Sequence, residues 1–383
     1  TTQTECAAGT YQASTGQSSC TDASAGYYVP TTGQTTQTEC AVGTYQASTG
    51  QTSCDTASAG YYVGSTAQST QTACSIGTYQ PNTGQTSCLD ADTGHYVELT
   101  AQIEQVACNA GFYQDINGAH FCYYATAGHY VESSAASYQT DCVIGTYQPN
   151  TGQTSCLDAD SGHYVNTAAS TIQTACAIGT YQPNTGQTSC TDSSAGYYVD
   201  TTASTTQTEC AVGTFQANNG QTSCDDADAG HYVAVTASTT QEECPAGTYN
   251  VNTGSISSDD CLDADAGYYV DSTGSDSQTA CAVGTYQSAT GQTSCADANP
   301  GYYVDSTAST TQTACAAGTY NPTYGQSTCY NATTGSYTSS AGSTSVTWAS
   351  MGHYVPTSGA TSQMAADAGY YVDSTGSDSQ TAC

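Results

Sequence analysis

The chain has 383 residues, with 32 acidic side chains and no lysine or arginine, so its formal net charge is −32. Such a chain repels nucleic acids and acidic lipid surfaces, and it lacks the cationic side chains that usually hold phosphates. Only 8% of its residues are charged, and three Phe, one Trp and two Met cannot supply a large apolar core. We therefore expect no nucleic-acid partner and no enzyme of the pocket-forming kind.

Cysteine content points to another means of holding the fold together. Twenty-one cysteines in a chain poor in aliphatic residues indicate a disulfide-stapled fold made in an oxidising compartment. We expect an extracellular or cell-surface protein. No run approaches 18 apolar residues and no signal-peptide pattern opens the sequence, so we expect no membrane insertion and a mature chain or a window cut from a longer chain.

The cysteines repeat along the whole sequence, with alternating spacings of 14 and 20 residues and a period of 34. Each 34-residue repeat consists of two similar 17-residue units, one with a Cys/Cys pair and one with an Ala/Gln pair at the same positions. A three-residue insertion falls between Cys244 and Cys261. Residues 1–383 are therefore expected to form a single tandem array, with drifted units at 98–124 and 324–364.

One exception to the rhythm indicates how the cysteines pair. Where the repeat demands cysteines at 349 and 363, the chain has Ala349 and Gln363. Both are lost together: pairing between units would then orphan Cys329 as well as Cys383, whereas pairing within each unit simply removes one disulfide. The predicted disulfides are Cys6-Cys20, Cys40-Cys54, Cys74-Cys88, Cys108-Cys122, Cys142-Cys156, Cys176-Cys190, Cys210-Cys224, Cys244-Cys261, Cys281-Cys295 and Cys315-Cys329, with Cys383 left alone.

Each stapled unit has the pattern of a small β-hairpin. A strand around Gly77-Thr78-Tyr79-Gln80, a turn at Pro81-Asn82-Thr83-Gly84 and a return strand Gln85-Thr86-Ser87-Cys88 are expected. A lone hairpin is unstable in water, so the disulfide, worth about 3 kcal/mol for such a loop, and the neighbouring units must stabilise it. We predict an all-β fold of stapled hairpins stacked into an elongated rod; the alternative is a β-solenoid with 17-residue coils.

The segment Cys244-Pro245-Ala246-Gly247-Thr248-Tyr249 resembles the half-module of ephrin-receptor-like and tumour-necrosis-factor-receptor-like cysteine-rich repeats. The alternation of Cys-x-x-Gly-Thr-Tyr units with Ala-Gly-Tyr-Tyr-Val segments also resembles repeats of very large microbial surface proteins. This resemblance implies an extended rod of hairpins outside a cell. The further cysteines of those receptor modules are replaced here by Ala/Gln units, so no ligand-binding function is carried over.

Two kinds of ion-binding residue are candidates, and both have a simpler explanation. Aspartate pairs follow the second cysteine of several units and would be weak Ca²⁺ ligands, or a solvated acidic edge: Asp90, Asp92, Asp158, Asp160, Asp226, Asp228, Asp263 and Asp265. Five histidines occupy one repeat position as substitutes for tyrosine, which favours surface aromatics over a metal site: His95, His129, His163, His231 and His353. No resident cofactor is expected, and no catalytic constellation is found.

Hydroxyl-rich segments suggest glycans. Asn331-Ala332-Thr333 is an acceptor for N-glycosylation in a proposed loop after Cys329, and the Thr/Ser runs suggest O-glycans. Thr-Gln-Thr recurs at 36–38, 70–72, 206–208 and 311–313, as an ice-binding ladder would, but this requires rows about 4.7 Å apart.

Apolar residues concentrate in the two drifted units. Phe112 and Phe121 suggest a lateral contact, whereas Tyr324, Trp348, Met351 and Met364 suggest the main contact between subunits. The sequence therefore favours a structural extracellular filament, stalk or sheath protein that assembles with itself. The alternative is an adhesin stalk or binding module that recognises a glycan, Ca²⁺ or ice, with recognition outside this window.

The pairing scheme is testable by peptide mapping without reduction. We expect every disulfide-linked fragment to come from one unit, and a Cys20 to Cys40 linkage would contradict the scheme. Trypsin should leave the chain uncut, because it contains no lysine or arginine, so a protease of other specificity is required.

Overall fold

The computed structural model describes residues 2–383, which form two-residue β-strands and one short 3-10 helix, η1 (Ser258–Asp260). In this part of the chain the 44 strands pair two by two in chain order, giving 22 two-stranded sheets. The two strands of a hairpin pair antiparallel, as in β5–β6, where Thr44 lies opposite Thr56 and Tyr45 opposite Asp55. The predicted all-β array of stapled hairpins is confirmed, and the alternative β-solenoid, which needs continuous sheets along the coils, is not formed. No helix in residues 2–383 has the length and apolar character to cross a bilayer.

The strands recur at a nearly constant interval. In chain order they are β1 Thr10–Tyr11, β2 Thr21–Asp22, β3 Tyr27–Tyr28, β4 Thr38–Glu39, β5 Thr44–Tyr45, β6 Asp55–Thr56, β7 Tyr61–Tyr62, β8 Thr72–Ala73, β9 Thr78–Tyr79, β10 Leu89–Asp90, β11 His95–Tyr96, β12 Val106–Ala107, β13 Phe112–Tyr113, β14 Tyr123–Tyr124, β15 His129–Tyr130, β16 Thr140–Asp141, β17 Thr146–Tyr147, β18 Leu157–Asp158, β19 His163–Tyr164, β20 Thr174–Ala175, β21 Thr180–Tyr181 and β22 Thr191–Asp192. They continue with β23 Tyr197–Tyr198, β24 Thr208–Glu209, β25 Thr214–Phe215, β26 Asp225–Asp226, β27 His231–Tyr232, β28 Glu242–Glu243, β29 Thr248–Tyr249, β30 Leu262–Asp263, β31 Tyr268–Tyr269, β32 Thr279–Ala280, β33 Thr285–Tyr286, β34 Ala296–Asp297, β35 Tyr302–Tyr303, β36 Thr313–Ala314, β37 Thr319–Tyr320, β38 Tyr330–Asn331, β39 Ser336–Tyr337, β40 Thr347–Trp348, β41 His353–Tyr354, β42 Met364–Ala365, β43 Tyr370–Tyr371 and β44 Thr381–Ala382.

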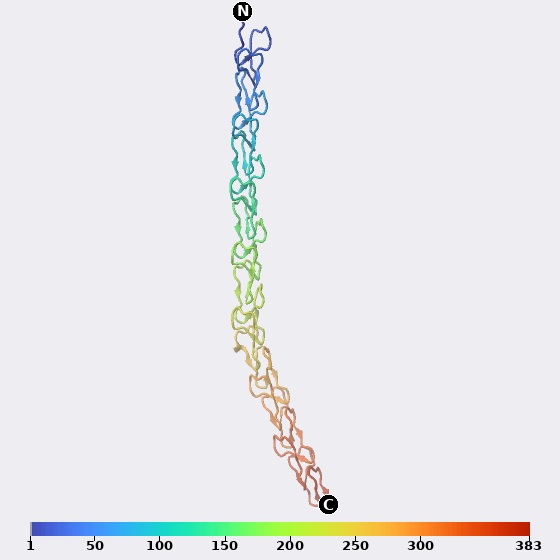
Figure 1. Cartoon of the computed structure of the whole chain (residues 1–383). Helices are drawn as coiled ribbons and strands as arrows, with labels where there is room; N and C mark the ends of the chain where they lie inside the picture. Colours follow the sequence, from blue (N-terminus) through green and yellow to red (C-terminus); the bar gives the residue numbers. More distant parts are fainter. Residues whose placement is uncertain (1) are drawn as a thin grey trace. The chain divides into compact units, whose positions relative to one another are not determined.

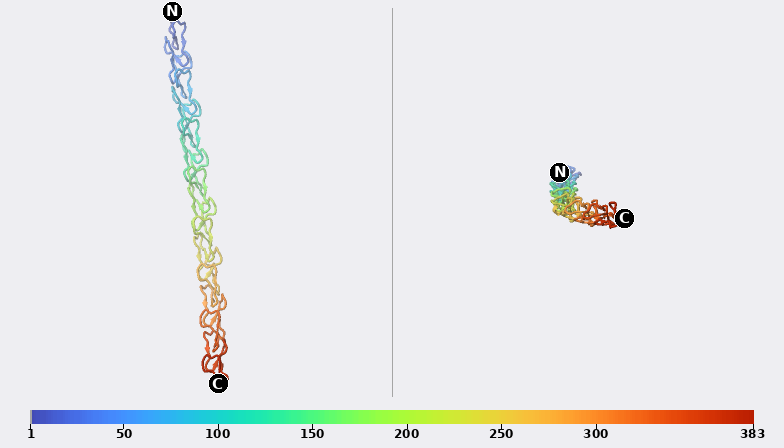
Figure 2. Two further views of the ribbon diagram at one scale, coloured as in Figure 1. Left: turned by 90° about the vertical axis from the view of Figure 1, so that its right-hand side faces the viewer. Right: turned by 90° about the horizontal axis from the view of Figure 1, so that it is seen from below.

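By its contacts the chain forms two compact units. The first comprises the described residues up to Cys176 together with Gln182–Thr191 and Ala203–Thr205, and the second comprises the remainder up to Cys383. Within each unit taken by itself, the hairpins follow one another in single file (Figures 1 and 2). A hairpin therefore has neighbours only before and after it.

The return strand lies further along the chain than the sequence suggested. In the β9–β10 hairpin it is Leu89–Asp90, after Cys88, and not Gln85 to Cys88. The reason is the Gln80 side chain, whose Nε2 donates to the Ser87 carbonyl at 2.9 Å while its Oε1 accepts from the Asn82 N–H at 3.1 Å. These bonds curl the loop around the amide, so residues 85–88 cannot extend along the first strand.

Successive hairpins are joined by backbone hydrogen bonds. Four bonds connect the β5–β6 hairpin with the β7–β8 hairpin: Gly43 N–H to Val63 O (2.8 Å), Gln46 N–H to Gln68 O (3.1 Å), Ala57 N–H to Gly43 O (2.9 Å) and Ala67 N–H to Cys40 O (3.0 Å). The same offsets recur from hairpin to hairpin within each unit. Because buried backbone groups must find partners, each hairpin satisfies its loops only when its neighbour is in place.

The core is a narrow column of small side chains. A stapled hairpin contributes its first cysteine and a buried Gln, as with Cys74 and Gln80, and an unstapled hairpin contributes Ala and Val, as with Ala57 and Val63. The side-chain amide of each such Gln hydrogen-bonds to the backbone of its own loop, as described for Gln80. These bonds offset the cost of burying a polar group. Each hairpin buries little apolar area, so disulfides and hydrogen bonds provide much of the stability.

Hairpins two places apart in the array also make contact, at glycine residues. Gly43 has φ +79°, a left-handed conformation that favours Gly, and a Cβ at this position would overlap the carbonyl oxygen of Gly84, two hairpins later. Gly50, in the turn, has φ +73° but only the Asp22 side chain nearby, at 3.6 Å or more. The equivalent turn position of the next hairpin is Ala67, at φ +57°. Gly43 is therefore required by the close approach of another backbone, whereas Gly50 is favoured only by its left-handed backbone conformation.

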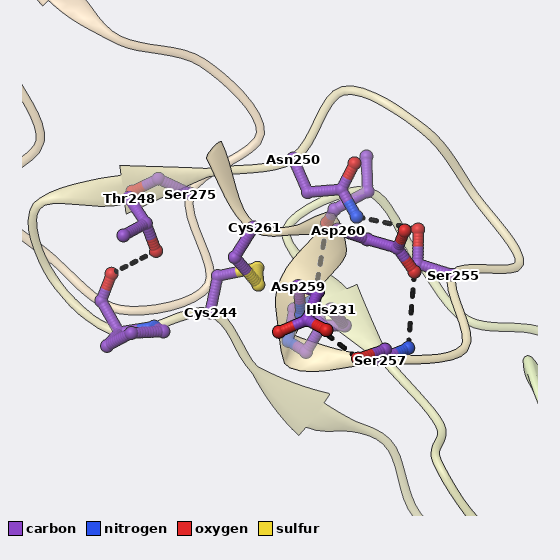
Figure 3. Close-up of a disulfide and its surroundings, with 12 residues drawn as sticks. His231, Cys244, Thr248, Asn250, Ser255, Ser257, Asp259, Asp260, Cys261 and Ser275 are labelled. Atoms are coloured by element: carbon purple, nitrogen blue, oxygen red, sulfur yellow. Dashed lines mark hydrogen bonds between the residues drawn. A yellow bond between two sulfur atoms is a disulfide. The ribbon is translucent and has the colours of Figure 1, made fainter. Parts of the chain in front are cut away.

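The three-residue insertion is absorbed in the loop of one stapled hairpin. Helix η1 occupies it, with the Ser257 side chain accepting from the Asp259 N–H at 3.1 Å and Asp260 accepting from the Ser257 N–H at 3.1 Å (Figure 3). Cys244 and Cys261 still lie 5.7 Å apart at Cα, as in the ordinary units. The insertion thus changes a loop and leaves the staple in register.

These two glycine positions provide a matched pair of variants. Gly43→Ala should destabilise its part of the array by about 3 kcal/mol or more, since left-handed strain of about 1 to 2 kcal/mol is joined by a backbone clash. Gly50→Ala should lower the stability only by the left-handed strain of about 1 to 2 kcal/mol. Hydrogen exchange of residues 40–90 measures both, and equal protection in the two variants would contradict the close contact.

Candidate functional site

Ten disulfides lie along the described chain, each within one hairpin and each following the scheme predicted from the sequence. Their Cα–Cα distances are 5.7 to 5.8 Å, within the usual range for disulfides. Cys383 is unpaired and exposed. The sulfur atoms are thus used for structure, with the first cysteine of the pair in the core column.

The hairpins without a disulfide carry a glutamine in its place. In the β7–β8 hairpin Gln71 occupies the position of the second cysteine, and its Oε1 accepts from the N–H of Ser58, the residue after the first cysteine position, at 2.7 Å. The same bond is made by ten further glutamines: Gln37, Gln105, Gln139, Gln173, Gln207, Gln241, Gln278, Gln312, Gln363 and Gln380. We call this bond the glutamine clamp. It also accounts for the Thr-Gln-Thr repeats, whose central residue is the clamp.

Gln363 shows how the chain compensates for the disulfide missing at 349 and 363. Its Oε1 accepts from the Ser350 N–H at 2.8 Å, and its Nε2 donates to the Ser350 hydroxyl at 3.0 Å. The missing disulfide is therefore replaced inside the chain and does not by itself require a subunit contact. The hairpin that has neither link is the preceding one, β39–β40, where Val346 occupies the clamp position.

The two carboxylates of each predicted Ca²⁺ pair have different surroundings. Asp92 accepts from Nε2 of the clamp residue Gln105 at 2.7 Å, whereas Asp90 lies over Gly118, two hairpins later. Asp160, Asp228 and Asp265 are held by their clamps in the same way, and Asp158, Asp226 and Asp263 lie over the turn glycines Gly186, Gly254 and Gly291. Within residues 2–383 no group of three or more His, Cys, Asp or Glu converges as metal ligands would. The clamp thus holds the second carboxylate of each pair, while the first lies beside a turn glycine two hairpins later.

Two polar pairs bridge strands at the aromatic positions. His129 Nε2 lies 3.0 Å from an Asp141 oxygen across the β15–β16 hairpin. In the β27–β28 hairpin, a hydrogen bond to Glu242 is the main cause that raises the pKa of Tyr232 above its ordinary value, with desolvation and the Glu242 charge adding to it. Because His95 and His163 face alanines across their hairpins, these pairs are local features and not a repeated site.

A groove of about 330 Å³ lies beside the first drifted unit, between the β11–β12 and β13–β14 hairpins. It is lined by Tyr96, Glu98, Asn109, Phe112, His120 and Phe121. Phe121 is 44% exposed, and its ring makes edge contacts with His120 and Tyr123 at centroid distances of 4.9 and 5.0 Å. Phe112 is half-buried against Tyr124, 4.5 Å away. Phe121 is thus presented to solvent, while Phe112 supports the cluster.

A second groove, of about 310 Å³, occupies the same position one 34-residue repeat later. Tyr130 and Glu132 correspond to Tyr96 and Glu98, but Thr146, Thr154 and Ser155 replace the three aromatic side chains. Phe112 and Phe121 were predicted from the sequence as contact residues, whereas Glu98 and His120 were not. Their signal was present, because only this repeat has His-Phe before its second cysteine, and Glu at position 98 recurs only at Glu132.

The other predicted surface residues are exposed but not gathered in one groove. Trp348 is 58% exposed and packs its ring edge on Gly376, while Tyr324, Met351 and Met364 are open to solvent. Asn331 lies in strand β38 and not in the loop expected for it, because the return strand starts right after the second cysteine. It is exposed, whereas the following Ala332 is buried.

Comparison with known proteins assigns no family. The chain matches no family model and no curated protein sequence. What the structure itself defines is the class: a cysteine-rich array of repeats of about 34 residues, which up to β36 each consist of one disulfide-stapled and one glutamine-clamped hairpin.

The equivalence of clamp and staple can be tested by converting one into the other. In Ala57→Cys/Gln71→Cys the two thiols should form an eleventh disulfide, because the backbone positions match those of Cys40 and Cys54. The oxidised variant should then keep the single unpaired thiol of the parent. Ala57→Cys alone, the control, should show two thiols, and the same result for the double variant would disprove the equivalence.

Proposed function

We propose that this chain is a structural protein of the cell exterior, which serves as a filament, stalk or sheath and assembles with itself. The observation that carries this proposal is the restriction of contacts to adjacent and next-adjacent hairpins. Stability in such an array is a sum over neighbours, so length can be added without redesigning a core. This is the property that a spacer or filament needs.

Two further features support an extracellular site. Ten disulfides persist only where the compartment is oxidising. The surface meets water mainly through hydroxyl and amide groups, with only 8% charged residues. Within this proposal the repeats are of the kind found in ephrin-receptor-like and tumour-necrosis-factor-receptor-like arrays and in very large microbial surface proteins. The Thr/Ser runs and the exposed Asn331 would carry glycans.

The subunit contact in this proposal is the second drifted unit. It presents Trp348, Met351 and Met364 to solvent, residue types enriched at protein interfaces. The β39–β40 hairpin also lacks both the staple and the clamp, so a docked chain would stabilise the weakest hairpin. A heterologous contact of this kind, repeated without closure, builds a filament.

Negative-stain microscopy of the purified chain tests this function. We expect regular polymers, and we expect Trp348→Ala to shorten them because it removes the largest exposed apolar side chain of the contact. Tyr138→Ala, which removes another exposed aromatic side chain, is the control and should leave them unchanged.

Separate threads from the unaltered chain would favour the second candidate, a stalk that carries a binding module. Polymers that are indifferent to Trp348→Ala would move the subunit contact elsewhere. The observation favouring a binding role is the aromatic groove beside β13–β14.

A further inference from the structure

We propose that the groove between the β11–β12 and β13–β14 hairpins binds the guanidinium or ammonium side chain of a basic segment in a partner protein. The groove is an open hollow of about 330 Å³, at the lower end of the size of ligand pockets. It would accept one long side chain, while the partner's backbone stays outside.

The walls of the groove suit a cation. Four aromatic residues, Tyr96, Phe112, His120 and Phe121, line it together with the acidic residue Glu98. A cation over an aromatic face is attracted by the ring quadrupole, more strongly where water is partly displaced. A carboxylate at the same site adds a charge-assisted hydrogen bond, for which guanidinium geometry is well suited.

The charge must come from another molecule. The chain has no lysine or arginine, and the Glu98 carboxylate has no hydrogen-bond or ion-pair partner within residues 2–383. The net charge of −32 attracts basic partners over distance and repels acidic ones. An uncharged ligand such as a neutral sugar would gain nothing from either feature, so charge complementarity favours the basic partner.

The aromatic cluster is not needed for folding of its hairpin. Gln114 Nε2 donates to the backbone carbonyl of Phe121 at 2.7 Å, as Gln148 does to that of Ser155 at 2.9 Å. The Cys108-Cys122 disulfide is equally independent of the side chains at 120 and 121. His120 and Phe121 are therefore departures from a Thr-Ser pattern that already closes the loop, which is expected if they serve recognition.

The second groove provides an internal control. It retains Tyr130 and Glu132 but has Thr and Ser where the first groove has aromatic rings. Both grooves share the general negative field of the chain. A cation that is held only by this field should therefore not distinguish them, whereas a cation held by the rings should prefer the first groove.

The probe is the peptide acetyl-Gly-Ser-Arg-Ser-Gly-amide, observed by ligand-detected NMR with the full chain at about 0.15 M salt, where exposed charges are largely screened. We expect Glu98→Gln and the double variant His120→Thr/Phe121→Ser to weaken binding by about fivefold or more, in line with the strength of a cation–π contact. Glu132→Gln should leave binding unchanged. The same peptide with neutral citrulline in place of arginine should bind at least about fivefold more weakly than the arginine peptide.

Three results would overturn the proposal: no binding of the arginine peptide, equal weakening by Glu98→Gln and Glu132→Gln, or competition by a neutral oligosaccharide with no preference for arginine over citrulline. The second would mean a general counterion effect and the third a sugar site. Because the Thr-Ser pattern is the one that other hairpins fold with, loss of binding in the double variant is not a folding defect. Unchanged hydrogen exchange of residues 91–135, which include both hairpins of the groove, would verify this.

Discussion

Backbone hydrogen bonds between successive hairpins are the interaction on which the rest of this structure depends. A two-stranded sheet of four residues cannot provide partners for the backbone groups of its own loops. The N–H of the glycine just before the first strand, such as Gly43, bonds to a carbonyl of the next hairpin instead. This contact brings main chains so close that a side chain at Gly43 would collide with a hairpin two steps away. The 17-residue interval suits this contact, and the one three-residue insertion keeps the bonds, as in Gly247 N–H to Val270 O at 2.9 Å, because the extra residues are confined to a loop.

Once the backbone holds the register, different chemistry can close each hairpin. A disulfide and a glutamine clamp perform the same task at equivalent positions, one covalently and one with a hydrogen bond worth about 1 kcal/mol. The alternation places a strong link beside a weak one, so every clamped hairpin lies between stapled neighbours over most of the chain. The exception is the segment from β39 to β44, where three hairpins without disulfides follow one another. Stability there depends most on packing and on whatever contacts the surface.

The outward side chains of the return strands and loops are free of this constraint, and they differ most between repeats. In the first drifted unit these positions hold aromatic rings beside Glu98, and in the second they hold Trp348 and two methionines. Because main-chain hydrogen bonds fix how the hairpins stack, the array tolerates such substitutions. Its surface can vary without a change in its core. Binding and assembly can therefore be located at different hairpins of one array.

The sequence by itself determined the repeat, the all-β class and the cysteine pairing, because these depend on spacing along the chain and on the joint loss of Cys at Ala349 and Gln363. It also pointed to Phe121 and Trp348 as unusual surface residues. It could not reveal that Gln71 is a clamp, that Asp90 and Asp92 are held apart, or that Glu98 shares a groove with Phe121. Those facts depend on how side chains from different hairpins meet. Only the tertiary structure decides them, since the close stacking of hairpins brings together residues separated by 13 to 41 positions in the chain.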